Sequence, residues 1–443
     1  MLSKPWTYAR NIVFSIVGLI VIVVLAFIAV NIKDQSPSAT ALEFQQSLEN
    51  RTSVDVADNG YIYLLGFDAA KDLDPNIVGQ ERIKWSNEVI RPTTGEFLSF
   101  PDAHYSFEKE LSKKFKKIID ACVQIDSDCM SGIHNDRELI QQSSQEIAWK
   151  VDRYLQLISY PAWLELAKVD IHLPLPSFGD VMKTQRISFV HAFATENNKT
   201  IVELLDKDLR FWRTVLKNTD MLIAKMIAVA AIKNNFSWTN YYFLGLDVDN
   251  KSEFLPTKLR QPFTDEELSM RRCLIGEWFF YAGAIDQPNA IDIDNITGKL
   301  LFMLSYQKQD TINMLVESLH AMQREIDVPL ADFEAALTQH SYLTPPKKTI
   351  IYYLTHPYNI VGNILKDLAP PSMYVNYVAR SKDLETFRRG LLFSIEKMDV
   401  AINAQSQHVS SYHSKPFMVD QTKKSVTVTG LSNDDKSQQT YFY

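Results

Sequence analysis

The stretch ISFVHAFATENNKTIVELLDKDLRFWRTVLKNTDMLIAKMIAVAAIKN, residues 187–234, decides the fold class. It is long and rich in residues that favour a helix, and Asn197-Asn198 marks a place where it divides into two helices. Its most apolar part, Met221 to Ile232, is only twelve residues long and contains Lys225, so it is typical of a buried helix and not of a membrane span. The stretch therefore predicts helices in the core.

Helical patterns continue on both sides of this stretch. Apolar residues three and four apart recur at 106–121 and 136–166. Thr264 to Glu267 is a capping box, and we expect the helix that it opens to run to about Ala284. Further helices are predicted at 298–325, 330–339, 358–368 and 383–404. The expected fold is mainly α, a multi-helix domain made of helical hairpins or an array.

The C-terminal part has a different pattern. Phe417 to Val419 and Ser425 to Thr429 are β-prone, and a polar segment lies between them. This arrangement predicts a small C-terminal β-hairpin, followed by a frayed tail over the last dozen residues.

An apolar run near the N-terminus has the length of a membrane span. Ile12 to Val30 is nineteen residues long, and its only weak positions are Ser15 and Gly18. As a helix it rises about 28 Å, close to the roughly 30 Å hydrocarbon core of a bilayer. The sequence therefore predicts a single transmembrane helix.

Charges around this run predict its orientation. Lys4, Arg10 and the amino terminus precede it, which favours a cytoplasmic N-terminus and a large part outside. A cleaved signal peptide with a site at Ala39-Thr40-Ala41 is the alternative, but the apolar core is long and the site is distant, so an uncleaved signal anchor is preferred. The expected organisation is a cytoplasmic tail at 1–10, a signal anchor at 11–32, a stalk at 33–57, a periplasmic helical domain at 58–404, and a β-hairpin with a flexible tail at 405–443.

Composition and motifs limit the classes of function. The net charge of -7 gives no basic footprint for nucleic acid. The sequence contains no H-E-x-x-H, G-x-S-x-G, G-x-G-x-x-G or Walker-type motif. We therefore expect no metal site and no cofactor, and the sequence identifies no catalytic residue.

Two cysteines suggest a covalent link. On one continuous helix Cys122 and Cys129 would lie about 10.5 Å apart along the axis, whereas a disulfide requires Cα atoms within roughly 7 Å. Asp126-Ser127-Asp128 and Gly132 favour a turn. We predict a Cys122–Cys129 disulfide at a helix–helix corner, and a buried free thiol at Cys273.

A short motif follows the stalk. The segment NGYIYLLGFDAAKDLDPNIVGQ, residues 59–80, combines a cap, apolar residues at helical spacing, a helix-ending glycine and an Asp-Pro turn. It contains no residue set for acid–base chemistry, so its predicted role is architectural, as the first element of the domain to dock after the stalk. The residues of this motif are Asn59, Tyr61, Leu64, Leu65, Gly66, Asp74 and Pro75.

This motif, with Gly79, the cysteine pair, VDRYLQL and the tail SKPFMVDQTKKSVTVTG, resembles a group of uncharacterised envelope proteins of Gram-negative bacteria. Those proteins are N-terminally anchored and have mostly helical periplasmic parts. Ser414 stands where the group has a glycine before Lys-Pro. The resemblance implies location and architecture, because the group has no established activity.

The expected function is that of a single-pass inner-membrane protein whose periplasmic helical domain is a non-catalytic interaction or scaffold component of the cell envelope. Its expected partners are the membrane and an envelope protein. The alternatives are a periplasmic hydrolase with a site assembled from scattered side chains, and a module that binds a lipid or another small molecule.

Overall fold

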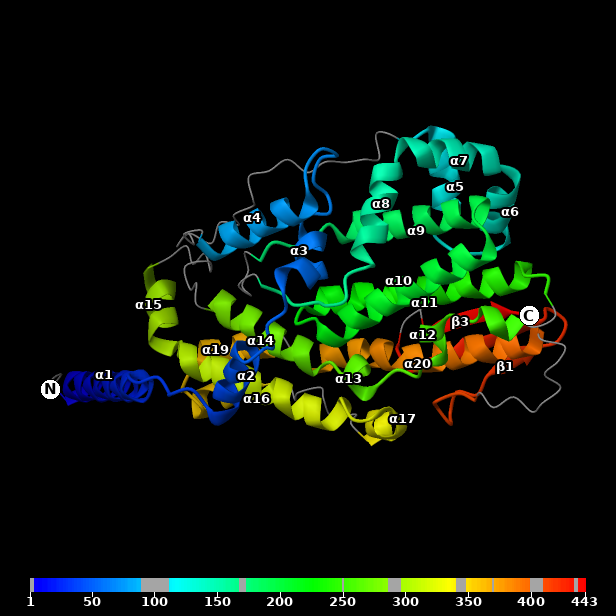
Figure 1. The fold of residues 1–443 in the computed structure, drawn as a ribbon. Helices are drawn as coiled ribbons and strands as arrows, with labels where there is room; N and C mark the ends of the chain where they lie inside the picture. Colours follow the sequence, from blue (N-terminus) through cyan, green and yellow to red (C-terminus); the bar gives the residue numbers. More distant parts are fainter. Residues whose placement is uncertain are drawn as a thin grey trace.

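A computed structural model describes residues 4–88, 111–166, 173–248, 251–285, 296–339, 348–368, 370–398, 409–433 and 437–443. In these ranges the chain is mainly helical, with a small antiparallel sheet near the C-terminus (Figure 1). The prediction of a mainly α fold is confirmed.

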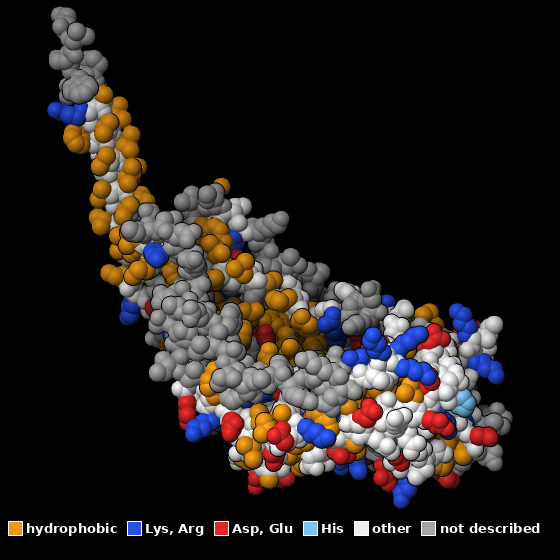
Figure 2. Space-filling model, turned by 90° about the horizontal axis from the view of Figure 1, so that it is seen from above, with side chains coloured by type: hydrophobic (Ala, Val, Ile, Leu, Met, Phe, Trp, Pro, Cys, Tyr) orange, Lys and Arg blue, Asp and Glu red, His pale blue; other side chains and the backbone are white. Residues whose placement is uncertain are grey.

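The first helix, α1 (Lys4–Asn31), carries the apolar run. Its segment Tyr8–Asn31, 24 residues long, is the one helical segment in the described ranges that is long and apolar enough to cross a membrane. Figure 2 shows hydrophobic side chains along this helix as it projects from the body. Length and composition thus agree with the expected span.

The next helix, α2 (Ala39–Glu49), lies in the segment expected to form a stalk. Ser38 caps it, and Ala41 and Phe44 are buried. The Phe44 ring meets the Trp278 ring edge-on, with centroids 5.8 Å apart. This ring contact anchors α2 on α14. α2 is thus the first helix after α1 that packs on the body.

The short motif follows as η1 (Val56–Asp58), α3 (Gly60–Leu65) and α4 (Pro75–Glu88). Asn59 caps α3 by accepting the Tyr61 amide at 3.2 Å. The Asn59 side chain also accepts the Leu164 amide at 3.0 Å and donates to the Leu164 carbonyl at 2.8 Å. Asn59 thus starts the helix and ties it to a distant segment, and every residue of α3 is buried.

Two glycines of this motif allow close contact between α3 and α4. A Cβ on Gly66 would lie 2.0 Å from the Pro75 carbonyl oxygen, and a Cβ on Gly79 would lie 1.9 Å from the Ile62 carbonyl oxygen. Any side chain would therefore force the two helices apart. Both glycines are required for the approach of the backbones.

Cys122 directly follows α5 (Lys113–Ala121), and Cys129 lies in the first turn of α6 (Ser127–Asn135). Asp126 caps α6 by accepting the amides of Asp128 and Cys129, each at 3.0 Å. The Cys122 and Cys129 sulfur atoms are at bonding distance, 2.13 Å, with Cα atoms 4.7 Å apart. The chain turns as predicted, because the Asp126 cap begins a second helix.

Next come α7 (Arg137–Glu146) and α8 (Ala148–Leu157). Arg153, in the VDRYLQL segment, donates to the carbonyls of Ala69 at 2.5 Å and of Ala70 and Leu73 at 2.7 Å each. Lys150 donates to the Phe67 carbonyl at 2.8 Å. The VDRYLQL segment and the motif at residues 59–80 are therefore in direct contact.

The fold-deciding stretch forms α9 (Phe178–Thr195), α10 (Asn198–Asn218) and α11 (Leu222–Gly245). The predicted break is present, because Asn197 caps α10 through the Thr200 amide at 3.1 Å. A second break at Thr219 to Met221 was not predicted. There, the Asp220 amide donates to the Glu165 carboxylate in place of a helical carbonyl. The Thr219 hydroxyl donates to the same carboxylate.

The capping box at Thr264 is confirmed, but the predicted helix is interrupted. It ends at Leu268 because the Met270 amide and the Ser269 hydroxyl bond to Asp327, at 2.9 and 2.6 Å. The remaining elements of this half are η3 (Lys251–Phe254), α12 (Thr257–Arg260), α13 (Asp265–Leu268), α14 (Arg271–Ile285), α15 (Ile296–Ser305), α16 (Lys308–Ile326), α17 (Leu330–Gln339), α18 (Ile350–Thr355), α19 (Ile360–Leu368) and α20 (Ser372–Met398).

The core has two parts that α20 joins. Tyr374 and Val378 pack with α2, α14, α16 and α17 in one part. Leu384 and Phe387, farther along α20, pack with α3, the helices α5 to α11 and the sheet in the other. One long helix thus links the elements nearest α1 to the rest of the body.

The sheet has three strands, β1 (Met418–Asp420), β2 (Ser425–Thr429) and β3 (Gln438–Phe442), in the order β1-β2-β3. The hairpin of β1 and β2 agrees with the prediction. The expectation of a frayed end was wrong, because β3 pairs with β2 and Asn240 of α11 bonds both backbone groups of Phe442, at 2.9 and 3.0 Å. The buried Tyr441 packs the strand against the body.

Candidate functional site

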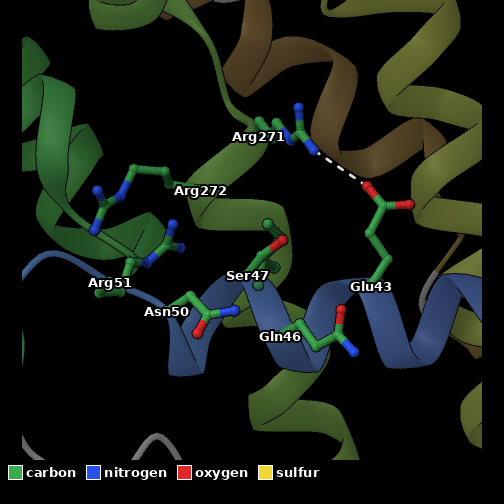
Figure 3. Close-up of a pocket in the computed structure, with 8 residues that line it drawn as sticks. Glu43, Gln46, Ser47, Asn50, Arg51, Arg271 and Arg272 are labelled. Carbon is green, nitrogen blue, oxygen red and sulfur yellow. Dashed lines mark hydrogen bonds and ion pairs between the residues drawn. The ribbon is translucent and has the colours of Figure 1, made fainter.

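A pocket of about 410 Å³ lies between α2 and the start of α14 (Figure 3). α2 and the residues directly after it form one wall, and α14 forms the other. The pocket is lined by Glu43, Gln46, Ser47, Asn50, Arg51, Arg271, Arg272 and Ile275. We call it the arginine pocket.

Three guanidinium groups dominate its charge. Arg51 Nη2 lies 2.5 Å from Asp220 Oδ1, and Arg272 Nε lies 3.2 Å from the same oxygen. Arg271 Nη2 pairs with Glu43 Oε1 at 3.2 Å (Figure 3). Three cations thus face two carboxylates, which leaves an excess of positive charge at the opening.

The position of this charge is unusual for a helix. Arg271 and Arg272 occupy the first turn of α14, where the helix dipole disfavours cations. Asp220 and Glu43 offset this cost by pairing with them. Burial lowers the pKa of Arg51, while Asp220 acts to raise it. The charged side chains of this cluster therefore come from three segments of the chain: α2 with Arg51, the start of α14, and Asp220.

Glu165 lies directly behind Asp220. It accepts hydrogen bonds from Trp163 Nε1 at 2.8 Å, from the Asp220 amide at 3.2 Å and from the Thr219 hydroxyl. Burial raises the pKa of Glu165 to about 7, and the nearby Asp220 charge contributes to the same shift. Both oxygens are used to hold the break between α10 and α11.

The raised pKa predicts how stability changes with pH. Between the unfolded value of about 4.3 and the folded value, the folded protein holds a proton that the unfolded chain has released. The free energy of unfolding should therefore fall as pH rises through this window, by at most about 1.4 kcal/mol per pH unit, and level off above the folded pKa. Glu165→Gln should flatten the fall, and chemical denaturation at several pH values measures it.

The difference in slope between wild type and Glu165→Gln from pH 6 to 7 isolates this effect, because Asp208, whose pKa burial raises to about 6, and His191, whose pKa burial lowers, titrate in both proteins. Replacement of the exposed Glu203 by Gln is the matched control and should keep the wild-type slope. An unchanged slope in Glu165→Gln would show that Glu165 is not the titrating group.

Other buried titratable groups join helices. Asp208 of α10 accepts hydrogen bonds from Tyr154, from Gln185 at 3.1 Å and from Asn235 at 2.9 Å, so it links four helices. Lys225 donates to the carbonyls of Leu216, Glu267 and Ser269 at 2.6–2.8 Å, and burial lowers its pKa to about 8. These groups hold the two helix breaks and the core in place.

The predicted site residues lie elsewhere. In the motif, Asn59, Tyr61, Leu64, Leu65, Gly66 and Pro75 are buried around α3 and α4, whereas Asp74 is exposed. The Cys122–Cys129 pair lies at the corner of α5 and α6. Cys273 is buried as expected, and burial raises the pKa of its thiol. In the described ranges no group of three His, Cys, Asp or Glu side chains could hold a metal ion.

Sequence reasoning did not find the arginine pocket. The signal available to it was the Arg271-Arg272 doublet directly after an acidic capping box, at a helix start where cations are disfavoured. Arg51, Glu165 and Asp220 are far apart in the sequence, and only the fold brings them together. No protein-family model, no curated protein and no solved structure matches the chain.

Proposed function

We propose that the protein is a single-pass inner-membrane protein of the bacterial cell envelope that binds an envelope partner without catalysing a reaction. In this proposal the N-terminus is cytoplasmic and the body is periplasmic. The positive charge before the apolar run of α1 supports the orientation. The cysteine pair at bonding distance supports an oxidising compartment.

The arginine pocket carries the proposal. It is open, it has an excess of positive charge, and one of its walls is the first helix after the span. Guanidinium groups bind carboxylates with two-point geometry, so an acidic segment of the partner protein fits it. Arg271 is the contact residue, because its side chain is 56% exposed and its ion pair with the half-exposed Glu43 is weak.

The alternatives have less support from the geometry. The Glu165 and Asp220 carboxylates favour a hydrolase by their proximity, but their oxygens already hold a helix break and two arginines. A lipid or drug-like ligand prefers a mostly apolar pocket, whereas charged and polar side chains line this one.

Photo-crosslinking in membranes of the source bacterium tests the proposal. A photoreactive residue replaces the exposed Gln46 on the pocket wall of the full-length protein. We expect a discrete crosslinked partner protein, which Arg271→Glu should abolish by reversing the charge. The control is Arg137→Glu, an exposed arginine on α7, and it should retain the crosslink. Two results would rule out the pocket as the contact. One is a crosslink that persists equally in Arg271→Glu and Arg137→Glu, and the other is no crosslink from position 46 when both arginines are present.

A further inference from the structure

The end of α1 is fixed to the body by a buried amide. Asn31 Oδ1 accepts the Asn359 amide at 2.9 Å, and Asn31 Nδ2 donates to the Pro357 carbonyl at 2.9 Å. Gln307 Nε2 donates to the Asn31 carbonyl at 2.6 Å. The segments before α16 and between α18 and α19 are therefore bonded to the last residue of the candidate span.

The residues after Asn31 are also bound along the body. Asp34 accepts the amides of Gln309 and Asp310, at 2.7 and 3.0 Å, and so caps α16. Asn313 of α16 accepts the Ser38 amide at 2.9 Å and donates to the Ser36 carbonyl at 2.9 Å. The connection between α1 and α2 thus holds the body at a fixed place below the span.

The length of the apolar run sets the depth of this junction. Ile12 to Val30 rises about 28 Å, which matches the hydrocarbon core of roughly 30 Å. If α1 spans a bilayer, Asn31 lies at the edge of the hydrocarbon. Gln307, Pro357 and Asn359, which bond to it, then lie at the depth of the lipid headgroups.

The body exposes apolar side chains at this same end. Figure 1 shows α15 and α19 at the end from which α1 projects, and α1 contacts α15. Met303 is 75% exposed and Leu368 is 73% exposed, and each has an exposed apolar neighbour one helical turn away on its own helix. We call this surface the end face; its exposed apolar residues are Leu300 and Met303 on α15, and Ile351, Ile364 and Leu368 on the two helices that flank Asn359.

Aromatic and basic residues accompany the end face. Tyr306, Tyr352 and Tyr358 are partly exposed, and Tyr358 donates to the Lys33 carbonyl at 3.4 Å. Lys33 and Lys299 are exposed. Tyrosine and lysine are typical of the membrane–water boundary, where the ring enters the headgroup layer and the ammonium group meets anionic lipid.

Three carboxylates near the junction have partners. Asp34 accepts the Gln309 and Asp310 amides, and Asp310 accepts the Asn359 side-chain amide at 2.7 Å, so both bond to neutral groups. Asp367 lies 3.0 Å from Lys348 Nζ, so its charge is partly compensated and it opposes contact with anionic lipid less than a free carboxylate would.

We propose that the end face lies in the headgroup and upper acyl layer of the bilayer that α1 spans. The proposal rests on the membrane anchoring in the proposed function, and it identifies the bilayer as what covers these apolar side chains. The bonds between Asn31 and the body supply the argument, because they hold the ends of α15, α18 and α19 that adjoin Gln307 and Asn359 at the depth where the bilayer begins. The body is then a surface-embedded domain with a fixed orientation, and not a tethered one.

Fluorescence quenching by lipid tests this contact in the full-length protein. Met303→Cys, Leu368→Cys, Leu19→Cys and Met418→Cys are each labelled with a polarity-sensitive thiol dye. Cys273 is buried and the other two cysteines are at bonding distance, so wild type treated with the same dye is the check for background labelling. The proteins are reconstituted in phosphatidylethanolamine–phosphatidylglycerol vesicles that carry a nitroxide at a shallow or a deep acyl position.

We expect the shallow nitroxide to quench the dyes at 303 and 368 and the deep one to quench the dye at 19 on α1. The dye at 418 on β1, 53% exposed and at the opposite end of the body in Figure 1, should lose no fluorescence. Quenching at 19 without quenching at 303 and 368 would overturn this proposal and leave the anchor intact. No quenching at 19 would overturn both. Blue-shifted but unquenched dyes at 303 and 368 would mean that protein covers the end face, and would also overturn the proposal.

Discussion

The Leu65→Asp variant should lose about 4 kcal/mol or more of its free energy of unfolding, and with it much of its folded population. Leu65 is fully buried in α3, and it packs in the larger part of the core. An aspartate there leaves a buried charge without a designed partner and removes an apolar side chain at the same time. Since ordinary domains are stable by only about 5–15 kcal/mol, most of the margin disappears.

Thermal denaturation of the detergent-solubilised full-length protein, followed by circular dichroism, measures this loss. Leu73→Asp is the matched control, because Leu73 lies in the same motif but is 49% exposed. Its effect should stay within about 0.5 kcal/mol. A wild-type melting curve for Leu65→Asp would contradict the place of α3 in the core.

Replacement of Arg213 should cause the second large loss in the free energy of unfolding. Its guanidinium pairs with both oxygens of Glu267, at 2.7 and 2.8 Å, and donates to the carbonyls of Lys258, Gln261 and Pro262 at 2.8–2.9 Å. Arg213→Leu therefore leaves the buried Glu267 carboxylate with its Thr264 cap but without its cation, and leaves three carbonyls without this donor. Breaking such a buried pair costs about 3–5 kcal/mol, which denaturant titration at neutral pH measures.

Two further variants sharpen this prediction. Arg213→Leu with Glu267→Leu should recover part of the loss, because no buried charge remains. Lys217→Ala removes the pair of Lys217 with Glu266, which joins the same two helices at the surface, and should cost at most about 1 kcal/mol. Equal losses from the buried and the surface variants would show that burial does not decide the strength of these pairs.

The Arg213 contribution also depends on pH. Burial acts to raise the pKa of Glu267, but the Arg213 hydrogen bond and the Thr264 cap outweigh it and hold that pKa below its ordinary value. The stabilisation is therefore complete above the unfolded value of about 4.3 and is lost as pH falls through the lower folded pKa. Arg213→Leu should remove this part of the loss in acid.

Local signals in the sequence predicted the elements that depend on neighbouring residues. Thr264 caps a helix as expected, and Asn59 caps the helix that was expected to begin at Asp58 or Asn59. Asn197 caps α10 at the division expected at Asn197-Asn198. The Cys122–Cys129 turn followed from helix geometry and from the aspartates between them. Each of these features is decided within a few residues, so the chain itself contains the information.

Breaks that distant residues cause were missed. The helix predicted from Thr264 stops at Leu268 because Asp327 binds the backbone there, and the second break in residues 187–234 depends on Glu165. The last strand was mistaken for a frayed tail although its pairing partner, β2, is close in the sequence, because the Asn240 bonds that tie it to the body come from some two hundred residues earlier. Spacing along the sequence does not report such contacts.

The sequence by itself determined that the chain is mainly helical, that it carries one membrane-length apolar helix, and that residues 59–75 form a capped helix and a turn. Periodicity, capping and apolar length are local properties, and they suffice for these conclusions. Only the tertiary structure decided that α2 packs on α14, that Arg51, Arg271 and Arg272 meet, and that Asn31 bonds to the body beside an exposed apolar surface. These features join segments tens to hundreds of residues apart, and it is packing of the whole core that brings their side chains within bonding distance.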